Sequence, residues 1–181
     1  MSKPGKILAG GTLTLLVDRL LNRSKGLLSG SQGLSVRAGS VDNSDEGSLV
    51  SQAGIDLAVQ GLLSNRDGGA LISQGVLTAT VGNLDNRSGI LSSQSRLELH
   101  GEQLNNQGGL LLADGTIEVD GQRLNNSLKG IVNSKSTISL QLAELDNSDE
   151  GIIAADGALV LVAGQLTNND RGQIASKADL Q

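Results

Sequence analysis

The feature that most constrains this chain is a repeat of about 21 residues that runs through all of its 181 residues. One asparagine marks each unit, with steps of 20 to 22 residues between them: Asn22, Asn43, Asn65, Asn86, Asn106, Asn126, Asn147 and Asn168. A glycine follows each asparagine by three or four residues: Gly26, Gly47, Gly69, Gly89, Gly109, Gly130, Gly151 and Gly172. A period that lasts through the chain predicts one array of stacked supersecondary units.

Four positions of each unit are aliphatic throughout the array. In the unit that begins at Gly109 they are Leu111, Ile117, Val119 and Leu124. The second and third of these are two residues apart, and the residue between them is polar in all but one unit, which is typical of a strand with one buried face. A small residue always stands four after the glycine, which indicates an inward corner. We therefore expect three short strands and their turns in each unit.

One unit cannot bury enough apolar surface to offset the entropy of ordering its own backbone, so the units must stack. Stacking in register pairs each strand with its counterparts above and below, about 4.8 Å away. The sequence thus predicts an all-β fold, a right-handed parallel β-helix (solenoid) of about nine coils of ~21 residues with three short strands per coil. The repeat asparagines would form an amide ladder and adopt left-handed backbone angles at a turn.

Composition narrows the class of function. The chain lacks Phe, Tyr, Trp and Cys, which suits a core of identical layers and excludes disulfides and thiolate metal sites. The net charge of -5 comes from interspersed charges, so we expect no nucleic-acid binding. No run of 18 apolar residues occurs, so no membrane insertion is expected. Residues 1–4 are interpreted as a leader or as residues added in cloning, and residues 5–181 as a single β-helical array cut from a longer filament.

The unit Leu-[Asp/Asn]-Asn-x-x-Gly-x-[Leu/Ile]-x-[Ser/Ala] is clearest at residues 84–93. It resembles the haemagglutinin repeat of filamentous haemagglutinin and of contact-dependent growth inhibition proteins. The resemblance covers residues 5–181. It implies a long exoprotein of Gram-negative bacteria, exported by two-partner secretion through an outer-membrane partner transporter and held at the cell surface as a β-helical filament. The family's secretion domain and its carboxy-terminal toxin or maturation regions have no counterpart in these residues.

Two features are candidate sites of chemistry. The acidic turn at 42–47 recurs identically at 146–151, and its oxygens could hold calcium, but a solvated turn is favoured because other coils carry Arg or Lys there. His100 is the only histidine and stands at an outward position with no implied catalytic partner. Coil length varies by only one or two residues, which leaves no loop to build a catalytic cleft. We therefore expect no enzyme activity, no cofactor and no metal.

An aliphatic residue stands just after the glycine in four consecutive coils: Ile90, Leu110, Ile131 and Ile152. We call this set the apolar stripe. Solvent-facing strands favour polar residues, so the apolar stripe is a candidate lateral contact. Simple β-propensity on an exposed face is the alternative explanation.

The leading functional hypothesis is a structural one. The chain would be an elongated shaft segment of a secreted virulence exoprotein, either an adhesin or a contact-dependent inhibition protein, that presents distal binding or effector regions. The alternative is an adhesive module that itself binds a host or bacterial surface ligand through an exposed β-face. Expected partners are the outer-membrane transporter during export and a cell-surface receptor, and open strand edges predict end-to-end self-stacking.

Overall fold

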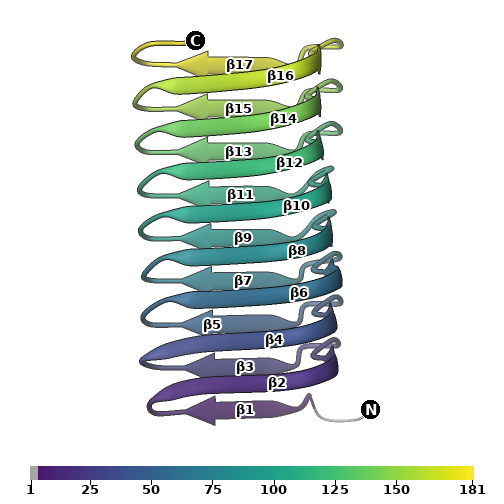
Figure 1. Cartoon of the computed structure of the whole chain (residues 1–181), viewed down its shortest axis with the longest axis vertical. Helices are drawn as coiled ribbons and strands as arrows, with labels where there is room; N and C mark the ends of the chain where they lie inside the picture. The colour runs from purple at the N-terminus through teal and green to yellow at the C-terminus, as the bar shows by residue number, and fades with distance from the viewer. Residues whose placement is uncertain (1–3) are drawn as a thin grey trace.

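The structure is a computed structural model that describes residues 4–181. The leader expected at residues 1–4 therefore lies outside the described residues, apart from Pro4. Within residues 4–181 the chain forms seventeen strands and no helix. The strands alternate between two parallel sheets that rise together along one axis (Figure 1).

Strands of four residues build one sheet, which we call the short-strand sheet. Its members are β1 (Lys6–Ala9), β3 (Leu27–Gly30), β5 (Ser48–Ser51), β7 (Ala70–Ser73), β9 (Ile90–Ser93), β11 (Leu110–Ala113), β13 (Ile131–Ser134), β15 (Ile152–Ala155) and β17 (Gln173–Ser176).

Strands of nine or ten residues build the other sheet, the long-strand sheet. Its members are β2 (Thr12–Leu21), β4 (Gly33–Asp42), β6 (Ile55–Ser64), β8 (Leu77–Asp85), β10 (Leu97–Asn105), β12 (Ile117–Asn125), β14 (Ile138–Asp146) and β16 (Leu159–Thr167).

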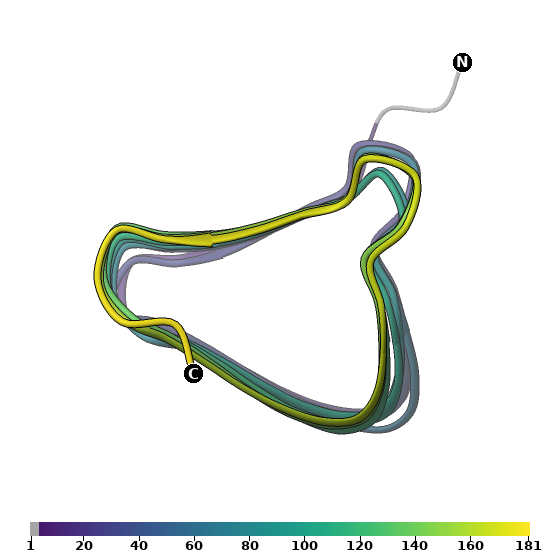
Figure 2. The same cartoon turned by 90° about the horizontal axis from the view of Figure 1, so that it is seen from above.

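Seen along its axis, the molecule has a triangular outline and the coils superpose closely (Figure 2). The chain turns anticlockwise as it rises toward the viewer, so the solenoid is right-handed, and the predicted fold class is confirmed. One detail of the prediction was wrong: a coil has two strands, not three. The expected second and third strands are one continuous strand that bends around a corner. Pairing continues through the bend, as in the register of Gly101 with Gly121 and of Gly121 with Leu142.

The register places like positions on like positions from coil to coil. Leu91 pairs with Leu111, and Leu111 with Val132. The step from Asn43 to Asn65 is 22 residues long, and its extra residue lies in β6. For this reason the pairing of β6 with β8 shifts in register between Val59 and Leu62. This bulge absorbs the insertion locally, so the coils above and below stay aligned.

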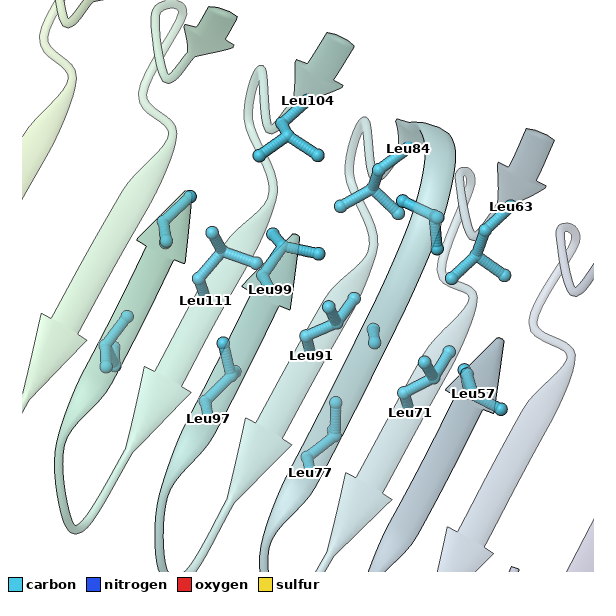
Figure 3. Packing of buried hydrophobic residues seen from close by; sticks show 14 of the residues in the cluster. Leu57, Leu63, Leu71, Leu77, Leu84, Leu91, Leu97, Leu99, Leu104 and Leu111 are labelled. Carbon is cyan, nitrogen blue, oxygen red and sulfur yellow. The ribbon is translucent and has the colours of Figure 1, made fainter. Parts of the chain in front are cut away.

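The core is a set of aliphatic columns that fill the triangle (Figure 3). Leu71, Leu91, Leu111 and Val132 are each 0% exposed and form one such column. The inward positions predicted from the repeat are buried in the middle coils. A further inward column lies at the bend of the long strands and was not assigned from sequence, because two of its members are glycine: Val17, Ala38, Val59, Val81, Gly101, Gly121, Leu142 and Ala163.

Candidate functional site

The repeat asparagines line up inside the turn that joins each long strand to the next short strand. The Nδ2 of each donates to the Oδ1 of the asparagine in the following coil, from Asn22 through Asn168, at 2.7–2.8 Å. The same amide also donates to backbone carbonyls, as Asn106 does to Gly109 and Ile131. Asn43 through Asn147 are 0% exposed, so the ladder satisfies polar groups that are cut off from water.

The repeat glycines stand against this ladder, and close approach explains their residue type. A Cβ added to Gly89 would lie 1.9 Å from the backbone oxygen of Asn65 and 2.6 Å from the Oδ1 of Asn86. The other seven repeat glycines would meet an asparagine oxygen at 2.1–2.6 Å. None of the eight has a positive φ. Their role is to admit the neighbouring coil, not to bend the chain.

The left-handed residues of the turn are not the asparagines, and that expectation was wrong. They are the one or two residues just before the glycine, such as Asp45 (φ 54°) and Glu46 (φ 63°), or Gly108 (φ 61°) in a shorter turn. The asparagine cannot take this conformation because its backbone still pairs with the next coil, as when the Asn43 amide donates to Ser64.

In each of the two acidic turns, the first carboxylate accepts hydrogen bonds from a serine of the same turn. The Ser44 hydroxyl and amide donate to Asp42 Oδ1 at 2.5 and 3.2 Å, and Ser148 and Asp146 repeat this arrangement. Partial burial opposes ionisation of Asp42, but the bonds from Ser44 and the charge of Arg23 outweigh it and lower the pKa of Asp42. Within residues 4–181 no three His, Asp or Glu side chains gather in a way that could hold a metal ion.

His100 lies on the outer face of β10, half-buried, where its register neighbours are Thr80 and Asp120. A hollow of about 740 Å³ lies at the bend of β2, β4 and β6 and is lined by Leu16 and Arg37. It extends to Thr80, the register neighbour of His100, and contains Asp18 as its one carboxylate.

The apolar stripe lies on the outer face of the short-strand sheet, in one column. Ile90 pairs with Leu110, Leu110 with Ile131, and Ile131 with Ile152. Each of the four is half-buried, because its neighbours in the column cover its flanks. The four side chains thus make one continuous ridge.

A second outward column runs beside the apolar stripe and was only partly recognised from sequence. It contains Leu8, Ser29, Val50, Ile72, Ser92, Leu112, Asn133, Ala154 and Ala175. Comparing the third residue after each repeat glycine would have revealed this column. The two columns make a flat face whose most exposed large members are Leu8 (64%) and Ile72 (41%).

Charged turns border this face. On the side of the ladder turns, a groove of about 290 Å³ separates Ile131 and Ile152 from the turn residues Lys129, Glu150 and Arg171. Glu150 accepts ion pairs from Lys129 at 3.8 Å and from Arg171 at 2.5 Å. On the opposite side, exposed charges alternate in sign from coil to coil: Asp114, Lys135, Asp156 and Lys177.

The comparisons with known proteins agree with this geometry. The model of the haemagglutinin repeat family matches residues 2–81, 55–121 and 121–181. No curated protein and no solved structure matches significantly. Among residues 4–181 there is no helix that could span a membrane. Since the repeat model covers nearly the whole chain and the coils follow its period, this chain belongs to the haemagglutinin repeat family, a structural repeat of shaft or adhesin-type segments.

Proposed function

We propose that this chain is a rigid spacer within a secreted or cell-surface exoprotein and carries no enzymatic activity of its own. In this role it holds a distal binding or effector region at a fixed distance from the cell. An outer-membrane transporter would export the whole protein, as the resemblance to two-partner secretion exoproteins implies.

The observation that carries this proposal is the unbroken stacking along the axis. The amide ladder and the aliphatic columns continue through every coil from Asn22 to Asn168 without a gap or an inserted domain. A rod whose every layer bonds to the next resists bending, because bending would open several hydrogen bonds and part of the core at once.

Removing one whole coil tests the spacer role. Deletion of residues 90–109 joins Gly89 to Leu110 and keeps the register, so the rod should stay folded and shorten by about 5 Å, one strand spacing. Duplication of the same residues should lengthen it by that amount. Small-angle X-ray scattering measures the maximum dimension. A change in dimension that does not follow the number of coils would contradict a rigid spacer.

The adhesive alternative is favoured by one observation, the flat apolar face of the short-strand sheet. A panel of purified surface polysaccharides and host matrix proteins, applied to this chain in a binding assay, separates the two functions. A spacer binds none of them. Binding that is lost when Ile131 is replaced by Thr would identify an adhesive face instead.

A further inference from the structure

We propose that the outer face of the short-strand sheet is a self-association surface. A second copy of this chain packs on it face to face and antiparallel, with the two-fold axis between β11 and β13. This inference holds for a spacer and for an adhesive segment alike, so it does not depend on the proposed function.

The first support is the lack of charge on this face. Each of the nine short strands presents its first and third residue outward, and among all of these only Lys6 is charged. The outer face of the long-strand sheet differs, because it carries Arg37, Asp56, Glu98 and Asp120. Charges on the outer face of a sheet keep it soluble and unpaired, so the uncharged face is the one suited to a partner.

The second support is the period of the face. Its ridges repeat at one strand spacing, about 4.8 Å, over nine strands. A partner must offer ridges of the same spacing to remain in contact over that length. Another copy of this chain offers that spacing.

The third support is the position of the apolar stripe. Its four members are centred between Leu110 and Ile131, at the proposed two-fold axis. An antiparallel copy sets Leu110 against Ile131 of the second copy and Ile90 against Ile152. Two sheets that pack in this way bury their facing side chains in a layer about 10 Å thick.

The bordering charges favour the same axis. Asp114 comes opposite Lys135 of the second copy, on the side away from the ladder turns. On the ladder side Arg87 comes opposite Glu150, and Asp67 opposite Arg171. The two-fold axis makes each of these pairs twice, and opposite charges facing across an interface fix its register.

Three other arrangements are less favourable, and two of them place like charges together. A parallel copy, with its ladder turns over the opposite turns, sets Lys129 against Lys135 and Glu150 against Asp156. If the two-fold axis of the antiparallel pair passed through β13, Lys135 would face Lys135 of the second copy. An axis between β13 and β15 satisfies the charges but sets Leu110 against Gln173 and shortens the overlap by two strands.

The overlap spans six strands, from β7 to β17, which gives a footprint of about 400 Å² on each copy. The two copies together bury about 800 Å², which is below the size of stable, specific interfaces, so the dimer should be weak and concentration-dependent. Cross-linking of engineered cysteines with a short bis-maleimide suits a weak dimer, and the chain contains no cysteine of its own that would interfere.

The test mixes two single-cysteine variants, Ile90→Cys and Ile152→Cys, one of them carrying a size tag. A short bis-maleimide then spans the roughly 10 Å between the facing backbones, and mixed cross-linked dimers should form at least tenfold faster than either homodimer. In the proposed packing two copies of residue 90 are three strand spacings apart along the rod, about 14 Å, in addition to the gap between the sheets, which is beyond the reach of the short linker. The control pair is Ser35→Cys and Ser139→Cys, on the outer face of the long-strand sheet, and should cross-link only at the rate of random collision.

Sedimentation at rising protein concentration provides the second measurement. Leu110→Glu should abolish the concentration-dependent increase in mass, while Ser139→Glu should leave it unchanged. Ile131→Thr gives a milder variant if Leu110→Glu unfolds, which thermal melting would reveal. Homodimers that form as fast as mixed dimers, or a chain that stays monomeric near millimolar concentration, would overturn the proposal.

Discussion

A single buried amide of the ladder joins three coils. Asn106 donates to Asn126 at 2.7 Å and to the carbonyls of Gly109 and Ile131, and accepts from Asn86. Replacing Asn106 by Ala leaves these buried groups without a partner, and we expect a loss of about 3 kcal/mol in the free energy of unfolding, measured in urea. Asn83→Ala is the control, since Asn83 is exposed on β8. Equal losses in the free energy of unfolding for the two variants would show that the ladder adds no stability.

The carboxylates of the turns give stability a dependence on pH. The side chain of Arg87 donates to Asp85 and lowers the pKa of Asp85 below its ordinary 3.8, although partial burial acts against this. A carboxyl whose pKa is lower in the folded state stabilises the fold above its ordinary pKa, and the contribution disappears as the pH falls below about 4. The Asp85→Asn variant should therefore lose less stability than the natural chain between about pH 5 and pH 3. Urea unfolding at each pH measures the difference, and parallel curves would contradict it.

Within one short strand, neighbouring side chains have opposite environments. Leu111 is 0% exposed, whereas Leu112 points outward and is half-buried. Leu111→Asp places a charge among stacked leucines and should cost at least about 4 kcal/mol or prevent folding, while Leu112→Asp should cost about 1 kcal/mol. Circular dichroism during thermal melting at low concentration measures both. Similar melting temperatures would mean that the inward and outward assignment of β11 is incorrect.

The strands show how far the sequence can be interpreted. The alternation around Ile117 and Val119 predicts a strand correctly, because these two residues are buried and Glu118, which lies between them, points outward. The bend that follows could not be predicted. Its inward column includes Gly121, where a Cβ would lie 2.3 Å from the Gly101 oxygen, so tight backbone packing replaced the aliphatic residue that would have signalled a buried position.

The apolar stripe illustrates the same limit for the candidate site. Its residues and their common column followed from the repeat. Their partial burial did not, since it depends on how much each side chain covers the one beside it. Nor could the flanking groove be foreseen, because it arises where the ladder turns meet the sheet.

The whole molecule is a stack in which each coil contacts only its neighbours. Such arrays lose stability in steps when coils are removed, because the remaining interfaces are unchanged. Removal of residues 152–181 should therefore leave the preceding coils folded, with a lower melting temperature and proportionally less β signal in circular dichroism. Deletion of residues 97–106, which removes β10 but keeps β9, should unfold far more of the chain. A complete loss of structure in the first variant would indicate one indivisible domain.

The amides of the ladder all point the same way, each giving its hydrogen toward the carboxy-terminal side. Their dipoles therefore add instead of cancelling, and the ladder has a net dipole along the rod axis. We call the Asn22 end of the ladder its head and the Asn168 end its tail. At the tail Asn168 accepts the last hydrogen bond of the ladder and donates only to the carbonyl of Gly172, within its own turn. At the head an Asp would meet the oxygen of the next coil, and two acceptors would face each other. The two ends of the array thus differ in what they offer a capping residue, and reversing a coil within the array would interrupt the hydrogen-bonded ladder at that layer.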